Sequence, residues 1–339
     1  MRVFVGEYVC GGGFAEQSSE QLPLSMRREG EAMLRAIVED LSEFSETVVM
    51  LEDRFELSFD YSKVLSFDPE KPLWSQWVDG ARGCDSAVII APETDGLLAK
   101  GVAALRSSGV DVIAGSGDFL RVASDKLLTA QLLHQAGVAH PAYFAIEDQR
   151  MAAEVAASGR FVVKPRDGCG TQKINLFDDF DAALSTMDEN SLMQAWVPGQ
   201  SISISLLASG TNQTFLPAVS QEIVSDDFAY LGGCGPLNDT AQRRATALAS
   251  RAINAMPPTA RGFVGLDMIL ADEPSNDCVI EINPRLATSY VGLRQMIHGN
   301  LAARLFDIET GPVRCKATVD SVRWTPDGEV TCDAPAIAQ

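Results

Sequence analysis

The sequence predicts an α/β protein that opens with a Rossmann-like lobe. Two observations lead to this prediction. Apolar runs typical of buried strands alternate with amphipathic helical segments over roughly the first 120 residues, which favours a parallel sheet covered by helices. With 339 residues, 46% of them hydrophobic, the chain can also bury a large core in two or three packed units.

The elements of this lobe follow one another in order. Residues 1–9 are expected to form a buried strand that runs into three glycines, Gly11 to Gly13. Ser25 is then expected to cap an amphipathic helix. Further strands are expected at residues 47–51, 86–91 and 110–114, with a helix at residues 97–107 that Gly109 ends.

Two loops of the lobe are candidates for substrate contact. The glycine run lacks the G-x-G-x-x-G spacing of dinucleotide sites, so it is either a tight turn or a ligand contact centred on Gly12. Loop 91–96 follows a strand whose carboxyl end would open onto the crevice of the sheet. Acidic side chains in these loops could attract a protonated amine. For the two acids of loop 91–96, the alternative role is capping of the following helix. The candidates are Glu7, Glu93 and Asp95.

A helical segment and a hairpin with a glycine-rich tip follow. Asp125 and Lys126 open a helix that runs to Gly137, and another helix is expected near residues 148–158. A strand at residues 161–165 carries Lys164 and leads through loop 167–171 to a strand at residues 173–177. Glycines let backbone N–H groups approach a phosphate closely, and a lysine on the preceding strand would point at the same anion. An ordinary hairpin turn explains this loop equally well.

The following region is expected to mix strands and helices. Residues 192–199 end a strand that could offer backbone groups to a purine, and the alternating run 201–207 predicts another strand. A glycine-rich loop is expected at residues 228–236, before a helix at residues 239–256. Near the C-terminus, only a short strand around residues 319–324 is expected.

The most informative stretch is a pair of short strands between residues 262 and 285. Asp267 ends the first strand, and Glu281, Asn283 and Arg285 occupy alternate positions of the second, so these three side chains project to one side. Carboxylates and an amide oxygen suit Mg²⁺, which completes its shell with phosphate oxygens; Mn²⁺ is an alternative ion. The other interpretation is an acidic strand face that is merely solvated.

Composition narrows the class of function. The net charge of −19 argues against nucleic acid or an anionic membrane as partner, because both require a basic surface. Seven irregularly spaced cysteines indicate a reduced compartment, and only three histidines make a His-ligated metal site or a serine-hydrolase triad hard to assemble. No apolar run is long enough to span a membrane, and Glu7 interrupts any signal peptide, so we expect a cytoplasmic protein.

The order of these motifs resembles that of the ATP-grasp superfamily. The resemblance covers roughly residues 123–297 and implies an ATP-grasp fold with a Rossmann-like domain at residues 1–120, a small α+β lid at 121–190, a C-terminal α+β subdomain with the metal site at 191–310 and a tail at 311–339. The five motifs that carry it are Asp125-Lys126, Val163-Lys164-Pro165 with Gly168-x-Gly170-Thr171, Gln194 with Val197-Pro198-Gly199, Gly265-Leu266-Asp267, and Glu281-Ile282-Asn283-Pro284-Arg285.

The resemblance also implies roles for individual residues. Those expected to bind ATP are Lys126 and Lys164 at the phosphates, Gly168, Gly170 and Thr171 in the loop over them, and Gln194 and Val197 at the adenine. Those expected to bind magnesium are Asp267, Glu281 and Asn283. Arg285 and Lys164 would lie beside the reacting phosphate. The ribose position, commonly Glu in the family, falls on Gln200 or Ser201 and stays open.

The implied activity is that of a ligase joining a carboxylate to an amine through an acylphosphate. Residues 7–13, 28–33 and 91–96 look like those of the tyramine–glutamate ligase subgroup of methanofuran-type cofactor synthesis, which implies glutamate and an aromatic amine as small-molecule substrates. Two alternatives are an ATP-grasp carboxylase or carbamoyl-phosphate-type enzyme acting on bicarbonate, and an ATP-binding module without turnover. A homodimer is left open.

Overall fold

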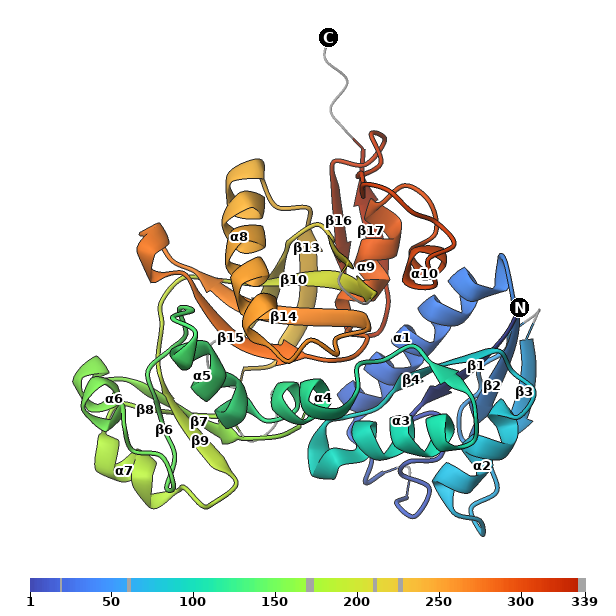
Figure 1. Cartoon of the computed structure of the whole chain (residues 1–339), viewed down its shortest axis with the longest axis horizontal. Coiled ribbons are helices and arrows are strands. Elements are labelled where there is room, and N and C mark those ends of the chain that lie inside the picture. Colours follow the sequence, from blue (N-terminus) through green and yellow to red (C-terminus); the bar gives the residue numbers. More distant parts are fainter. Residues whose placement is uncertain (19, 60–61, 169–173, 210–211, 225–227, 335–339) are drawn as a thin grey trace.

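The computed structural model describes residues 1–18, 20–59, 62–168, 174–209, 212–224 and 228–334. Figure 1 shows three units, coloured from blue to teal, green, and yellow to red along the chain. Each unit is built on its own sheet. The first unit is the N-terminal lobe, the second is the lid and the third is the C-terminal subdomain.

The N-terminal lobe is a parallel sheet with helices on both faces, as predicted. Its strand order is β3-β2-β1-β4-β5. Alternate residues of the central strand enter two cores: Val3 and Val5 pack on the side of α1, whereas Phe4 packs on the side of α2 and α3. The strands are β1 (Arg2–Glu7), β2 (Glu46–Leu51), β3 (Ser62–Ser66), β4 (Ser86–Ile90) and β5 (Asp111–Val112), and the helices are α1 (Leu24–Ser42), α2 (Leu73–Ala81) and α3 (Leu97–Ser107).

Three features of this lobe differ from the sequence-based expectation. The strand β3 and the helix α2 were not foreseen, because β3 is an edge strand with mostly exposed side chains and α2 is short. Ser25 lies inside α1 rather than at its cap, since the helix begins directly after Pro23, whose side chain makes no capping bond.

The lid is a small antiparallel sheet that two helices connect to the first lobe. Asp125 caps the second of these helices by accepting bonds from the backbone N–H groups of Leu127 and Leu128, as its position predicted. The strand order is β6-β9-β7-β8. The connecting helices are α4 (Gly117–Ala123) and α5 (Lys126–Gln135), and the lid consists of β6 (Tyr143–Phe144), α6 (Ala152–Ser158), β7 (Phe161–Pro165), β8 (Asn175–Phe177), α7 (Phe180–Ser185) and β9 (Ser191–Ala195).

The C-terminal subdomain contains the largest sheet, whose paired strands are all antiparallel. The order is β15-β14-β10-β12-β13-β16-β17, with β11 paired to β10. The strands are β10 (Gln200–Ser209), β11 (Asn212–Phe215), β12 (Val219–Ile223), β13 (Tyr230–Gly235), β14 (Gly262–Leu270), β15 (Cys278–Asn283), β16 (Ser321–Trp324) and β17 (Val330–Asp333). The helices are α8 (Asp239–Ala255), α9 (Ser289–Met296) and α10 (Leu301–Leu305), with short 3₁₀ turns at Pro274–Asn276 and, in the first lobe, Thr94–Gly96.

The glycine-rich segment before α8 was expected to be a loop, and this expectation was wrong. It forms the strand β13, between β12 and β16. The reason is close packing against Trp324 of β16, since a Cβ atom at Gly232 would lie 1.9 Å from the Trp324 carbonyl oxygen and one at Gly233 would lie 2.3 Å from its ring. Glycine here makes room for a neighbouring strand and its indole.

The C-terminal strands complete this sheet. Trp324 is 1% exposed, covers Gly292 of α9 and donates from its Nε1 to the hydroxyl of Tyr230 over 3.1 Å. The segment near residue 324 is therefore an integral part of the sheet, although its sequence indicated only a short strand.

The first lobe and the C-terminal subdomain share one hydrophobic core. Side chains of α1, among them Ile37 and Leu41, pack in the same cluster as Leu293 and Met296 of α9. A buried ion pair reinforces this contact, because Asp40 Oδ1 of α1 lies 2.6 Å from Arg294 Nη2 of α9. The two units are thus held in a fixed arrangement around the space between them.

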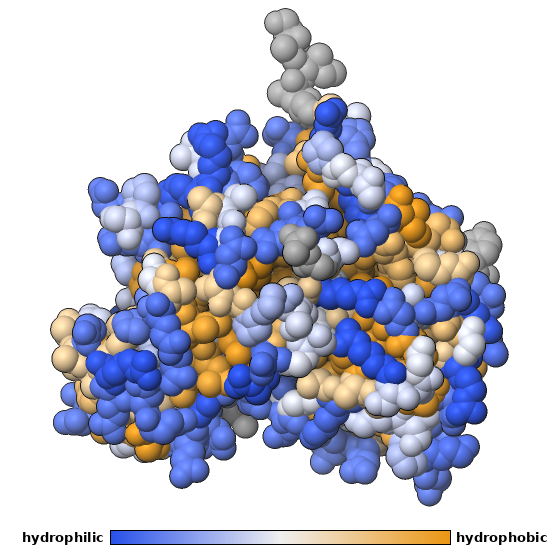
Figure 2. Space-filling model, viewed as in Figure 1, coloured by the Kyte–Doolittle hydropathy of each residue, from blue (hydrophilic) through white to orange (hydrophobic). Residues whose placement is uncertain are grey.

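The surface agrees with the acidic composition. On the face shown in Figure 2, hydrophilic side chains cover most of the surface and apolar ones show in smaller areas between them. Among the described helices, none combines the length and apolar character needed to cross a lipid bilayer.

We expect Trp324→Ala to destabilise the protein by about 3–5 kcal/mol, because it removes a fully buried indole and leaves a cavity over Gly233 and Gly292. Urea unfolding followed by circular dichroism would measure the loss. Val330→Ala, on the partly exposed neighbouring strand, should cost less than about 0.5 kcal/mol and serves as the control. A loss below about 1 kcal/mol for Trp324→Ala would show that the C-terminal strands add little to the sheet.

Candidate active site

The predicted metal ligands lie together on neighbouring strands. Asp267 of β14 is directly opposite Glu281 of β15, and Asn283 is opposite Gly265. Side chains of directly opposite residues share a face of the sheet, which places both carboxylates side by side. Asn283 Nδ2 donates to Asp267 Oδ2 over 3.0 Å, so the amide belongs to the same group. The alternation predicted for residues 281 and 283 is therefore realised.

Two lysines from different units converge on the same carboxylate. Glu281 Oε2 lies 3.7 Å from Lys126 Nζ at the start of α5 and 3.9 Å from Lys164 Nζ on β7 of the lid. A backbone bond links the two supporting elements, because the Lys126 N–H donates to the Arg166 carbonyl over 2.8 Å. Arg166 also pairs with Asp125 at the α5 cap, at 2.7 Å. These bonds fix both lysines above the strand pair.

The charges in this cluster shift one another's pKa. Burial raises the pKa of a carboxylate, but at Glu281 the charges of Lys126 and Lys164 outweigh it and hold the pKa below its usual range. Burial and the charge of Glu281 raise the pKa of Asp267, because two carboxylates share one face. Burial also lowers the pKa of Lys164 to about 8, against the effect of Glu281. Asp267 is thus the carboxylate of the pair whose protonated form is favoured by burial and by its neighbour's charge.

The residues present fit a magnesium ion. Among the described residues, no three His, Cys, Asp or Glu side chains cluster as a complete metal cage. Asp267, Glu281 and Asn283 instead offer two carboxylates and an amide, and Mg²⁺ is commonly held by one or two carboxylates with water and substrate phosphates as the remaining ligands. A divalent cation would also relieve the repulsion that raises the pKa of Asp267.

Of the other positions expected to contact ATP, Gly168 adjoins this cluster. Lys126 Nζ donates to the carbonyl of Gly168 over 2.9 Å, which brings the start of the glycine loop to the lysines. Gly170 and Thr171 lie outside the described residues. Gln194 is buried in β9, Val197 follows on the chain between lid and subdomain, and Ser201 lies in β10 opposite Ile269. The contacts described for Gln194, Val197 and Ser201 do not assign them to adenine or ribose.

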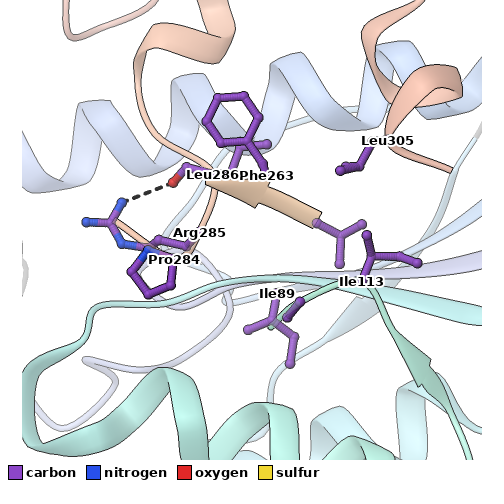
Figure 3. Close-up of a pocket in the computed structure, with 9 residues that line it drawn as sticks. Ile89, Ile113, Phe263, Pro284, Arg285, Leu286 and Leu305 are labelled. Carbon is purple, nitrogen blue, oxygen red and sulfur yellow. Dashed lines mark hydrogen bonds between the residues drawn. The ribbon is translucent and has the colours of Figure 1, made fainter. Parts of the chain in front are cut away.

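Arg285 connects this cluster to the first lobe. Its Nε lies 3.0 Å from Glu93 Oε1, and its Nη1 donates to the carbonyl of Leu286 over 3.0 Å. Figure 3 shows the guanidinium turned away from the apolar side chains of Ile89 and Ile113, which line a cavity of about 10 Å³ between the lobes. This cavity holds one water at most. The cavity is therefore too small for a substrate, and Arg285 can contact a ligand only through its guanidinium.

The N-terminal loops reach the cluster as the crevice argument predicted, but their acids differ in availability. Asp95 has an exposed side chain, and its N–H donates to Asp167 Oδ2 of the lid over 2.8 Å. Glu7 is 3% exposed, accepts from the N–H of Cys10 over 2.7 Å and is close enough to Arg285 for its pKa to be affected. Glu93 is buried against Arg285.

The glycine run is explained by packing alone. Gly12 has φ of 100°, and a Cβ atom there would lie 2.5 Å from the ring of Phe67. The carbonyl of Gly11 accepts a bond from Trp77 Nε1 over 3.0 Å. The tight-turn interpretation therefore accounts for Gly12 without a ligand.

Several residues of the site were not predicted from the sequence. Gln221 Nε2 of β12 donates to Asp267 Oδ1 over 2.9 Å, and Ser203 of β10 lies directly opposite Asp267. Burial raises the pKa of Glu29 on α1, and the charge of Arg285 offsets part of this rise. The alternation of residues 201–207 could have indicated Ser203, whereas nothing local marks Gln221.

Comparisons with known proteins agree with this geometry. Residues 123–289 match the model of the ATP-grasp domain, and residues 45–118 match that of the pre ATP-grasp 3 domain. A tyramine–L-glutamate ligase from Methanocaldococcus fervens is 25% identical over 293 residues, which cover 85% of this chain and 88% of that protein.

Solved structures show the same fold. An ATP-grasp superfamily protein from Archaeoglobus fulgidus superposes with a TM-score of 0.71 at 23% identity, covering 96% of this chain and 92% of that one. Biotin carboxylase from Campylobacter jejuni, solved as a β,γ-ATP complex, superposes with a TM-score of 0.71 at 13% identity, covering 95% of this chain and 74% of that one. The two matched domains together span more than half of the chain. The chain therefore belongs to the ATP-grasp superfamily and resembles its tyramine–glutamate ligase subgroup.

Proposed function

We infer that the protein is an ATP-dependent ligase that joins a carboxylate to an amine through an acylphosphate. One observation carries this proposal. Lys126 and Lys164 lie within 3.9 Å of Glu281, directly beside Asp267, so cations for a triphosphate adjoin oxygen ligands for a divalent metal. Phosphoryl transfer needs this combination, because negative charge on the transferring group must be held in place.

The proposed reaction has two steps. A carboxylate oxygen of the first substrate attacks the γ-phosphorus of ATP, the bond to the bridging oxygen breaks, and ADP leaves. The nitrogen of the neutral amine then attacks the acyl carbon, phosphate leaves with that carboxylate oxygen, and the nitrogen releases one proton to solvent. Neither step needs a histidine, which fits a chain that contains only three.

Each group of residues has its own proposed role in the first step, the transfer of the phosphoryl group. Lys126 and Lys164 would bind the phosphates, and Arg285, two residues beyond Asn283, would contact the transferring phosphoryl group. Asp267, Glu281 and Asn283 would hold magnesium, which would supply further positive charge to the phosphate oxygens when bound. The described start of the glycine loop, at Gly168, is already tied to Lys126 and would help to exclude water from the acylphosphate.

For the substrates we propose glutamate and an aromatic amine such as tyramine. The support is the relative that acts on this pair and matches the chain over 85% of its length. A buried carboxylate at Glu7, within the influence of Arg285, also suits a cationic amino group. We place the reaction in the cytoplasm, since the six cysteines that the structure describes are all free.

The direct test is to incubate the purified protein with ATP, MgCl₂, L-glutamate and tyramine. We expect equal amounts of ADP and of the amide of glutamate with tyramine, measured by coupled assay and mass spectrometry. Omission of either L-glutamate or tyramine should abolish the amide. ADP formation that depends on bicarbonate instead of glutamate would replace this proposal with the carboxylase alternative.

We predict that Glu281→Gln lowers the rate of ADP formation at least about a hundredfold while the protein stays folded, because one metal ligand and the partner of two lysines are lost. Glu273→Gln, at an exposed position of the turn between the same two strands, is the matched control and should keep the wild-type rate. Near wild-type ADP formation by Glu281→Gln would refute the metal site.

A second set of variants tests the phosphate contacts. Lys126→Ala and Lys164→Ala should raise the dissociation constant of Mg-ATP roughly tenfold or more, since a strongly acidic protein depends on local cations to bind a triphosphate. Lys63→Ala and Lys71→Ala, at exposed positions of the first lobe, should leave the dissociation constant of Mg-ATP unchanged. Isothermal titration calorimetry would measure all four, and equal effects would show that the two inner lysines have no special role.

The burial of Glu7 predicts a pH-dependent cost to stability. Burial raises its pKa from 4.5 to about 6, so folding takes up a proton between these values and stability falls as the pH rises through them. Glu7→Gln should therefore be more stable than the wild type by about 2 kcal/mol at pH 8 and nearly equal below pH 4. Urea unfolding at both pH values would measure this. A variant less stable at pH 8 would show that the ionised carboxylate stabilises the fold.

A further inference from the structure

We propose that Glu93 is a positioning residue that orients Arg285 toward the transferring phosphoryl group. This inference rests on the proposed function and assigns a different role from the amine contact that the sequence suggested. Glu93 belongs to the first lobe, whereas Arg285 follows the metal-binding strand β15. The catalytic geometry would then depend on how the two lobes dock.

The contact between the two residues is close and enclosed. The side chains of Glu93 and Arg285 are 3% and 11% exposed, and 3.0 Å separates Oε1 from Nε. The atoms are not aligned as a hydrogen bond, and among the described residues neither Glu93 oxygen accepts one. Taking a carboxylate out of water is costly unless a cation compensates it, and Arg285 is the cation that adjoins Glu93 in this place.

The backbone fixes Arg285 from the other side. Pro284 precedes it, and Arg285 Nη1 donates to the carbonyl of Leu286. The ion pair with Glu93 at Nε and the hydrogen bond from Nη1 to Leu286 together restrict the guanidinium. A planar guanidinium binds phosphate oxygens in a fixed geometry, so its orientation decides whether it can contact the γ-phosphate.

The loop that carries Glu93 also contacts the lid. The N–H of Asp95 donates to Asp167 Oδ2, and a Cβ atom at Gly168 would lie 2.9 Å from the Thr94 hydroxyl oxygen. Loop 92–96 therefore adjoins both Arg285 and the start of the glycine loop. One segment of the first lobe sets the position of both groups.

The chain contains a matched ion pair for comparison. Asp40 and Arg294 also join the first lobe to the C-terminal subdomain, with side chains 6% and 16% exposed and a separation of 2.6 Å. Neither lies among the residues of the candidate site. A purely structural role for Glu93 would give Glu93→Gln and Asp40→Asn the same signature, namely a lower melting temperature with unchanged turnover per folded molecule.

The experiment compares Glu93→Gln, Glu93→Asp and Asp40→Asn with the wild type, using L-glutamate and tyramine. We expect Glu93→Gln to lower kcat for ADP formation about tenfold to a hundredfold, with the KM values of ATP and tyramine unchanged. Glu93→Asp, which keeps the charge, should recover part of kcat. Asp40→Asn should lower only the melting temperature. A rise confined to the KM of tyramine would overturn the proposal and indicate an amine contact. An unchanged kcat in Glu93→Gln would overturn it and indicate a structural role.

A second readout does not depend on the identity of the substrates. ADP binding is measured by calorimetry with magnesium, with and without aluminium fluoride, which imitates a transferring phosphoryl group. In the wild type the fluoride should tighten ADP binding by about tenfold or more, and in Glu93→Gln this gain should disappear while the affinity for ADP alone remains. Retention of the gain in Glu93→Gln, or its absence in the wild type, overturns the proposal. If the wild type makes no amide from glutamate and tyramine but still shows this gain in ADP affinity, and Glu93→Gln lacks it, only the proposed substrates are refuted.

Discussion

The site depends on one carboxylate that three elements share. Glu281 of β15 is the common partner of Lys126 at the start of α5 and Lys164 in the lid, and it lies directly opposite Asp267. The chain has a net charge of −19, and at this point two lysines lie directly beside the acids. Helix α5, the lid and the largest sheet must all be folded and docked to bring these side chains together. The candidate site therefore depends on the complete fold.

The N-terminal lobe completes the site from the opposite side. Its sheet packs through α1 on the C-terminal subdomain, and its loops bring Glu7 and Glu93 to Arg285. Burying such carboxylates is unfavourable for folding, as the raised pKa of Glu7 shows. Strained electrostatics of this kind are common where a protein keeps groups for binding or catalysis. The arrangement supports a role for this lobe in the reaction rather than only in stability.

Sequence reasoning located the groups that follow local rules. Alternation along β15 placed Glu281 and Asn283 together, and the cap at Asp125 located Lys126. Contacts between distant segments were not accessible in this way. The Glu93 partner of Arg285 and the Gln221 partner of Asp267 depend on lobe docking and strand order. The glycines of β13 locally favour a loop, whereas their actual role is to accommodate Trp324, which is far away in sequence.

In the proposed reaction a substrate carboxylate takes the γ-phosphoryl group, which the arrangement of lysines and acids around Glu281 is suited to promote. The most direct measurement follows oxygen atoms. The protein is incubated with ATP, Mg²⁺, tyramine and L-glutamate labelled with ¹⁸O in its carboxylates, and the released phosphate is analysed by mass spectrometry. An acylphosphate route transfers one labelled oxygen to each phosphate for every amide formed. Amide formation with unlabelled phosphate would contradict it.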